Sequence, residues 1–205
     1  VSSPKLADLA DRVFEAIDAG VVTSRTGARF KPSTARTYRI YFDKYIRDGL
    51  GNCRITDLRR SHIQHLIDDI GPRKAGSTVK NSLMPLRLIF RYAADRDLVI
   101  VNPLIGLKLP AKDERPTKVI SPKQAKELLS ILAGTDRAIF ATALFAGLRL
   151  GELRALRWKH VDLEKGLIRV KRSWDPRAGD IPPKSKAGVR AVPLISDLRS
   201  QLIGI

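Results

Sequence analysis

An arginine bracketed by two glycines is the part of the sequence best suited to chemistry. Arg149 lies between Gly147 and Gly151, and Glu152 follows three residues after the arginine. The glycines predict a bend between two helical stretches. A planar guanidinium can bind a carboxylate or a phosphate through two parallel hydrogen bonds. The spacing alone leaves two interpretations equally open: a structural ion pair with Glu152, or a ligand for a phosphate group.

The charge of the chain favours a polyanionic partner. Lysine and arginine number 38 against 21 acidic residues, so the 205 residues carry a formal net charge of +17. Cationic side chains placed on phosphates release condensed counterions, which favours a nucleic acid. An anionic membrane is the rival, but the sequence shows neither a basic amphipathic helix nor a lipid anchor. The longest nearly apolar stretch, 138–148, is about half the length that spans a bilayer. We therefore expect no membrane partner.

Cysteine and histidine usage argues against a metal site. Cys53 is the one cysteine, which excludes an intramolecular disulfide and a cysteine-rich metal site. His62 and His65 lie three residues apart on an expected helix. No third ligand lies nearby in sequence, so a solvated or DNA-facing surface is the favoured interpretation. A free cysteine and the lack of a visible export signal fit a reducing cytoplasm.

The first half of the sequence predicts a helical domain. Apolar residues at helical spacing place helices at about 5–19, 33–48, 60–70 and 77–97. Pro85 lies inside the last helix and should kink it or leave one carbonyl unpaired. We assign residues 1–107 to this domain and regard 1–30 as an N-terminal extension.

A second unit is expected after a linker. Residues 108–119 contain two prolines and six charged side chains, a composition typical of an extended linker. Ser121 then caps a helix, Pro122 takes its first position and Gln124 completes a capping box. Another helix should open at Thr135 and Asp136. Residues 120–205 form the second unit in this interpretation.

Alternating polarity predicts a small sheet near the end of the chain. Residues 166–172 and 189–194 alternate between apolar and polar side chains, which indicates two antiparallel strands. Trp174 lies between them and predicts a turn anchored by a buried ring. The expected fold class is mainly α-helical with a small antiparallel sheet. The four tyrosines, Tyr38, Tyr41, Tyr45 and Tyr92, all lie in the helical domain.

The segment around Arg149 resembles the first conserved box of the tyrosine recombinases, the family of phage integrases. The resemblance rests on Gly147, Leu148, Arg149, Gly151, Glu152, Leu153, Leu156, Trp158, Val161 and Asp162. It covers essentially the whole chain, more strongly after Ser121. It implies an N-terminal SAM-like core-binding domain, a linker and the first part of a mixed α+β catalytic domain that breaks and rejoins DNA.

The resemblance also implies roles for particular residues. Arg149 would be the first catalytic arginine, which stabilises negative charge on the scissile phosphate in the transition state. Glu152 would orient the loop. A hairpin lysine would protonate the departing 5′ oxygen, and a neighbouring cation such as Arg149 would lower its pKa. Lys184 is favoured for this role, with Lys186 as the alternative. Both lysines could instead merely bind phosphate.

By the same resemblance the function is site-specific DNA integration or recombination through a 3′-phosphotyrosyl intermediate, with no cofactor. The nucleophilic tyrosine and the remaining catalytic boxes are expected beyond residue 205, so this chain alone should not cleave DNA. The partners implied are double-stranded DNA, three further subunits in a homotetramer on two duplexes, and an accessory directionality factor. The gene would belong to a bacterial or phage mobile element.

Basic residues of the helical domain are further candidates. The expected phosphate contacts are Arg59, Arg60, Lys80, Arg87 and Arg91. Charge runs are usually solvated faces, so each assignment is a hypothesis of its own. The alternative functions are a non-catalytic DNA-binding relative of the same fold and a basic RNA-binding protein.

Overall fold

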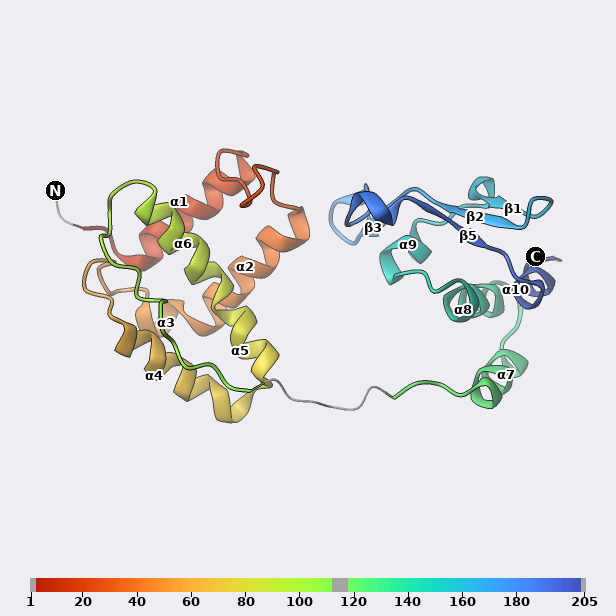
Figure 1. Cartoon of the computed structure of the whole chain (residues 1–205), viewed down its shortest axis with the longest axis horizontal. Helices are drawn as coiled ribbons and strands as arrows, with labels where there is room; N and C mark the ends of the chain where they lie inside the picture. Colours follow the sequence, from red (N-terminus) through yellow and green to blue (C-terminus); the bar gives the residue numbers. More distant parts are fainter. Residues whose placement is uncertain (1–2, 112–117, 204–205) are drawn as a thin grey trace. The chain divides into compact units, whose positions relative to one another are not determined.

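The computed structural model describes residues 3–111 and 118–203, with the side chain of Lys186 excepted. The chain forms two compact units, one on each side of residues 112–117. Half of the linker expected at 108–119, residues 112–117, therefore lies outside the described residues. The fold is mainly helical with small antiparallel sheets, as the sequence predicts. Figure 1 shows the elements of each unit.

The first unit is a helical bundle around one apolar core. Its helices are α1 (Leu6–Asp18), α2 (Pro32–Tyr45), α3 (Arg47–Leu50), α4 (Arg60–Ile70), α5 (Gly76–Ser82) and α6 (Met84–Ala94). The apolar stripes of α1 and α6 face inward. Phe14 of α1 and Phe42 of α2 pack edge to face, with 5.8 Å between the ring centroids. Burial of these stripes, rather than helix propensity alone, stabilises such short helices. The prediction of a helix over 60–70 is confirmed by α4.

The expected long helix over 77–97 is wrong, because the chain forms α5 and α6 instead. The break falls at Leu83, and Pro85 occupies the second position of α6. Proline has no N–H to donate, and its ring clashes with the carbonyl four residues earlier. These constraints are harmless in the first turn of a helix, where the N–H groups have no intrahelical acceptor. Pro85 therefore starts a helix rather than kinking one.

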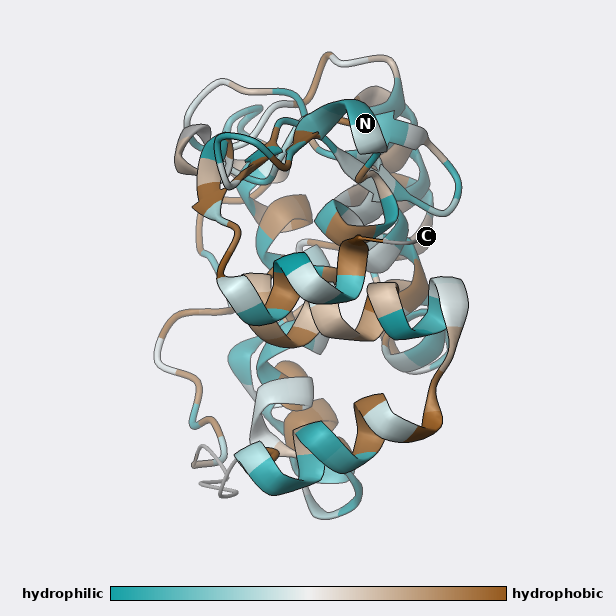
Figure 2. Cartoon of the chain, turned by 90° about the vertical axis from the view of Figure 1, so that its right-hand side faces the viewer, coloured by the Kyte–Doolittle hydropathy of each residue, from teal (hydrophilic) through white to brown (hydrophobic). Residues whose placement is uncertain are grey.

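The second unit combines four helices, in which α8 contacts α7, α9 and α10, with two small antiparallel sheets. Its helices are α7 (Pro122–Ile131), α8 (Gly134–Ala146), α9 (Leu150–Arg154) and α10 (Ser196–Leu202). Hydrophobic and hydrophilic residues follow one another in bands along these ribbons (Figure 2). The capping box at the start of α7 is confirmed, since Gln124 N donates to Ser121 Oγ at 3.2 Å and Ser121 N donates to Gln124 Oε1 at 2.9 Å.

The main sheet has the strand order β1-β2-β5 and is antiparallel throughout. Its strands are β1 (Val161–Asp162), β2 (Leu167–Val170) and β5 (Arg190–Pro193), which confirms the two strands expected near 166–172 and 189–194. Val170 pairs with Arg190 at the end where β5 begins. Ile168, Val170 and Leu198 are buried together in the core of this unit.

Residues 173–181 form a second, two-stranded sheet, where only a turn was predicted. It consists of β3 (Ser173–Asp175) and β4 (Gly179–Ile181). The expected buried ring is wrong, because Trp174 is 41% exposed. The turn is held instead by the buried Asp175 carboxylate, whose Oδ1 accepts from the backbone N–H groups of Arg177 at 2.9 Å and Ala178 at 3.0 Å. A short carboxylate can satisfy two turn amides, which an indole cannot.

Candidate functional site

The turn between α8 and α9 places Arg149. Gly147 ends α8 in the left-handed conformation, with φ of 58° and ψ of 34°, which glycine adopts without steric cost. Leu148 is buried, and Arg149 is the extended residue that precedes the first turn of α9. The backbone N–H of Arg149 donates to Glu152 Oε2 at 3.0 Å. The sequence expectation of a bend that presents Arg149 is confirmed.

The Arg149 side chain combines an ion pair with wide exposure. Its Nη1 donates to Glu152 Oε1 at 3.0 Å, and its side chain is 64% exposed. A guanidinium has five N–H donors. In the described part of the chain, the Arg149 guanidinium makes only the hydrogen bond from Nη1 to Glu152. The two interpretations of Arg149 therefore do not exclude each other, because the arginine can contact Glu152 and still present donors to an anion.

Arg190, which the sequence did not indicate as a site residue, is a second arginine at the same carboxylate. Its Nη2 donates to Glu152 Oε2 at 2.9 Å and its Nη1 donates to Glu152 Oε1 at 3.1 Å. The Glu152 side chain is 2% exposed and that of Arg190 30%. No sequence signal pointed to this pair, because it joins α9 to β5 across 38 positions.

The two arginines keep Glu152 ionised despite its burial. Hydrogen bonds from Arg190 are the largest cause that lowers the pKa of Glu152 to about 2, and the backbone and side chain of Arg149 add to it. Burial acts in the opposite direction, since a desolvated carboxylate is disfavoured. Two guanidinium groups therefore surround one carboxylate, and this three-residue cluster keeps one net positive charge.

The candidate lysines lie between β4 and β5. Lys184 is exposed in a bend, and Lys186 begins a 3₁₀ turn over Lys186–Gly188. The side chain of Lys186 lies outside the described part of the structure. Arg190 Nη1 also donates to the carbonyl of Gly188 at 3.2 Å. The lysine-bearing segment is thus tied to Arg190 and, through Glu152, to Arg149.

Two of the predicted DNA contacts line one groove of the helical unit. Arg87 and Arg91 lie one turn apart on α6 and border a groove of about 730 Å³. Arg91 Nη2 donates to the carbonyl of Thr23 at 2.8 Å, while Arg87 is exposed. Arg25 lines the same groove from the segment before α2. Arg25 was not predicted as a contact, because the sequence of a polar loop does not indicate which helix the loop covers.

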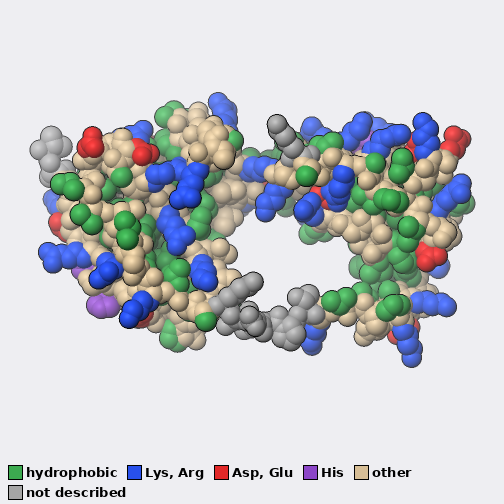
Figure 3. All heavy atoms as spheres, viewed as in Figure 1, with side chains coloured by type: hydrophobic (Ala, Val, Ile, Leu, Met, Phe, Trp, Pro, Cys, Tyr) green, Lys and Arg blue, Asp and Glu red, His purple; other side chains and the backbone are tan. Residues whose placement is uncertain are grey.

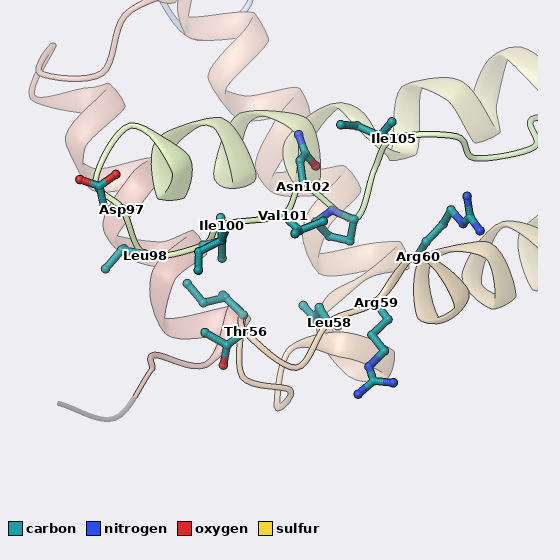
Figure 4. A pocket seen from close by; sticks show the side chains of 13 residues that line it. Thr56, Leu58, Arg59, Arg60, Asp97, Leu98, Ile100, Val101, Asn102 and Ile105 are labelled. Atoms are coloured by element: carbon teal, nitrogen blue, oxygen red, sulfur yellow. The ribbon is translucent and has the colours of Figure 1, made fainter.

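The other predicted contacts are separate from this groove. Arg59 and Arg60 border a second groove at the start of α4, beside the exposed apolar side chains of Ile100 and Val101 (Figure 4). Their side chains extend in different directions in this view. Lys80, on α5, lines neither groove. The five predicted residues therefore do not form a single cluster.

The surface of each unit is rich in basic side chains. Lysine and arginine side chains occupy much more of the visible face of each unit than acidic side chains do (Figure 3). In residues 3–111 and 118–203, no helix has the length and apolarity to cross a membrane. The same residues contain no cluster of three metal-ligating side chains. His62 has a structural contact, because its Nδ1 accepts from the backbone N–H of Arg59 at 3.2 Å.

Two family models match the chain. Residues 26–70 match the phage integrase N-terminal SAM-like domain, and residues 118–201 match the phage integrase family. The first match lies within the helical unit, and the second spans α7 to α10 and includes Arg149, Glu152 and Arg190.

Curated relatives and solved structures agree with these matches. Prophage integrase IntR of Escherichia coli K12 is 31% identical over 63% of this chain and 32% of its own length. A tyrosine recombinase XerC-like protein of Caldanaerobacter subterraneus is 29% identical over 82% of this chain and 48% of its own length. The chain thus spans less than half of either relative.

The fold is shared with DNA complexes of two integrases. The Tn1549 transposon integrase bound to a circular intermediate DNA matches 98% of this chain and 64% of its own, with a TM-score of 0.76 and 21% identity. A λ integrase dimer bound to a core site matches 98% of this chain and 54% of its own, with a TM-score of 0.71 and 17% identity.

Proposed function

Since this chain belongs to the phage integrase family of tyrosine recombinases, we propose that it is part of an enzyme that cuts and rejoins DNA at specific sites. Residues 1–107 would be the core-binding domain, 108–119 the linker and 120–205 the N-terminal part of the catalytic domain. The reaction would pass through a 3′-phosphotyrosyl intermediate. The phosphodiester is activated by cationic side chains, and no cofactor is required.

The observation that carries this proposal is the position of Arg149. Its guanidinium lies on a turn, is 64% exposed and is anchored by one hydrogen bond to a buried carboxylate. A donor group held in this way needs little reorganisation when charge develops on a phosphate oxygen. A surface arginine without such support would bind phosphate, but it would not be fixed in one orientation.

The other roles follow from the same chemistry. Lys184, or alternatively Lys186, would protonate the 5′ oxygen as it leaves. Glu152 supports Arg149 rather than reacting, because its buried carboxylate is ionised and already bonded to two arginines. The nucleophile is assigned to none of the four tyrosines Tyr38, Tyr41, Tyr45 and Tyr92, which lie on α2 and α6 of the helical unit.

The partner is double-stranded DNA. Arg87 and Arg91 would contact phosphates from their shared groove, with Arg25 beside them, whereas Arg59, Arg60 and Lys80 would make separate contacts. The working enzyme would be a homotetramer on two duplexes, in the cytoplasm of a bacterium, encoded by a phage or another mobile element. An accessory directionality factor would choose between integration and excision.

A suicide duplex tests the proposal with the complete gene product. A nick next to the cleavage position lets the short fragment diffuse away, so a covalent protein–DNA adduct accumulates. We expect an adduct that resists denaturation and is lost when Arg149 is replaced by glutamine. Duplex binding without any adduct would support a non-catalytic DNA-binding relative instead. Preference for single-stranded RNA over duplex DNA would overturn the proposal.

A further inference from the structure

Glu152 contacts two arginines that differ in exposure and in bonding. The Arg149 side chain donates to Glu152 through one Nη group and is 64% exposed. The Arg190 side chain donates to Glu152 through both Nη groups and is 30% exposed. The fork of Arg190 matches the two carboxylate oxygens, and such bidentate pairs are the strongest of their kind. Arg190 is therefore the main counterion of Glu152, and Arg149 is the minor one.

The charges of this cluster determine what Arg149 can bind. Without Arg190, the buried carboxylate would have Arg149 as its sole counterion among the residues that contact it in the structure. The pair would then be neutral and would attract an anion weakly. It would also draw the Arg149 fork inward, because a buried carboxylate needs hydrogen bonds on both oxygens. With Arg190 in place, Glu152 is already neutralised, and the positive charge of Arg149 remains available.

We propose that Arg190 is a positioning residue for the phosphate site: it neutralises and holds the Glu152 carboxylate, so that the Arg149 guanidinium stays charged and directed outward to the phosphodiester. This inference rests on the proposed function and adds to it. Arg190 acts through Glu152 and does not itself contact the phosphate.

The same side chain links the two catalytic elements. Arg190 begins β5 and reaches Glu152 on α9, and its Nη1 also donates to the carbonyl of Gly188. The backbone N–H of Gly188 in turn donates to the carbonyl of Ser185, next to both candidate lysines. One guanidinium thus joins the lysine segment to the helix that presents Arg149. A lysine at this position could bridge Glu152 and keep the charge, but it lacks the planar fork.

The test measures binding of inorganic phosphate at Arg149 in the 205-residue chain. Arginine side-chain resonances labelled with ¹⁵N report each guanidinium separately, and the Arg149→Lys variant assigns the signal. The variants are R190Q, R190K, E152Q and the double variant E152Q/R190Q. The formal charge of the cluster is one unit positive in the wild type and the double variant, zero in R190Q and two in E152Q.

The expected order of phosphate affinity follows these charges. R190Q should bind phosphate about tenfold more weakly at Arg149, the effect of losing roughly one charge-assisted hydrogen bond. R190K should stay within about threefold of the wild type, because it keeps the charge. The double variant should recover most of the loss, since no unpaired carboxylate remains. E152Q should bind at least as tightly as the wild type.

Arg169→Gln is the matched control. Arg169 lies on β2 and pairs with Asp162 at 3.1 Å, so its loss removes the same charge from the same sheet. It sits opposite Ala191, whose side chain points to the other face of β5 from Arg190. This variant should leave the Arg149 signal unchanged. Fluorescence of Trp158 and Trp174, the two tryptophans of the chain, verifies folding, because both lie in this unit.

The outcomes separate this inference from the proposed function. If wild-type Arg149 does not respond to phosphate at all, its assignment as a phosphate ligand fails. If the wild type responds and folded R190Q responds equally, only the role of Arg190 is overturned. A double variant as weak as R190Q would mean that Arg190 contacts the phosphate directly, which also overturns the inference. Should R190Q fail to fold, R190K and the double variant still decide the question.

Discussion

Glu152 and Arg190 face each other through two hydrogen bonds of 2.9 and 3.1 Å, although 38 positions separate them in the chain. This pair joins α9 to β5 at the point where Arg149 is presented. The glutamate is buried and the arginine is partly buried. Removing one partner alone would be strongly destabilising, because it would leave a buried charge with too few counterions. The carboxylate that Arg149 contacts is therefore held by a strand that begins far along the sequence.

Replacing Arg149 should separate catalysis from binding. In the complete gene product, Arg149→Gln should lower the rate of strand cleavage by about 100- to 1,000-fold, the typical effect of losing one preorganised donor. Duplex affinity should fall by less than about tenfold, because Arg149 would be only one of the proposed phosphate contacts. Adduct formation and fluorescence anisotropy measure the two effects. Arg154→Gln, an exposed charge on the same helix, should preserve both; equal losses in the two variants would contradict the prediction.

The ionised carboxylate of Glu152 should stabilise the folded chain at neutral pH and lose this effect in acid. Its pKa is lowered from 4.5 to about 2 in the folded chain, so its contribution is present above pH 4.5 and lost as the pH falls toward 2. The shift corresponds to about 3 kcal/mol. Urea unfolding followed by tryptophan fluorescence should show that E152Q is less stable than the wild type at pH 7. This gap should narrow between pH 4.5 and 2.5, and a constant gap would refute the explanation.

The identity of the general acid can be decided with a modified substrate. Replacing the bridging 5′ oxygen by sulfur gives a leaving group that departs without protonation, because a thiolate is far less basic than an alkoxide. In the complete gene product we expect Lys184→Ala to cleave the ordinary duplex at least about 100-fold more slowly, and the sulfur-bridged duplex at nearly the wild-type rate. Lys186→Ala serves as the comparison. If the sulfur-bridged duplex restores cleavage only in Lys186→Ala, Lys186 is the general acid. If it restores cleavage in neither variant, both lysines are phosphate contacts.

Gly147 should be required for the turn that presents Arg149. Its φ of 58° lies in the left-handed region, and among the described residues no atom beyond its immediate chain neighbours lies within 4 Å of where a Cβ would be placed. Gly147→Ala should therefore lower the free energy of unfolding by about 1–2 kcal/mol. The cause is the left-handed backbone conformation and not a clash with a neighbouring residue. Gly147→Asn should recover part of this loss, because asparagine tolerates that conformation better. Equal stability of the alanine variant and the wild type, measured by urea unfolding, would refute the conformational explanation.

The groove on α6 should contribute to the salt dependence of DNA binding. Arg87→Ala and Arg91→Ala should each reduce the slope of log affinity against log salt by about 0.9, the value per phosphate neutralised. Arg39→Ala provides the control, since Arg39 lies on α2 and is ion-paired with Asp18 at 2.7 Å. Anisotropy titrations at several salt concentrations measure the slope. A change as large in Arg39→Ala as in the groove variants would mean that overall charge, not the groove, sets the slope.

Local features were predictable because they depend on residues close in sequence. The helix over 60–70, the capping box of Ser121 and Gln124, and the paired strands near 167 and 192 follow from periodicity and capping chemistry. The family box around Arg149 was also recognisable from its own residues. Pro85 was noticed but misjudged, because the sequence does not show whether a proline lies inside a helix or begins a new one.

The sequence by itself determined that the chain is basic, that it is mainly helical, and that a turn between two glycines presents an arginine beside a glutamate. Only the tertiary structure decided that Arg190, not Arg149, is the main counterion of that glutamate, and that Arg25 joins Arg87 and Arg91 at one groove. The physical reason is distance along the chain. A contact between neighbours follows from backbone periodicity, whereas a contact across 38 positions depends on how a helix packs against a sheet.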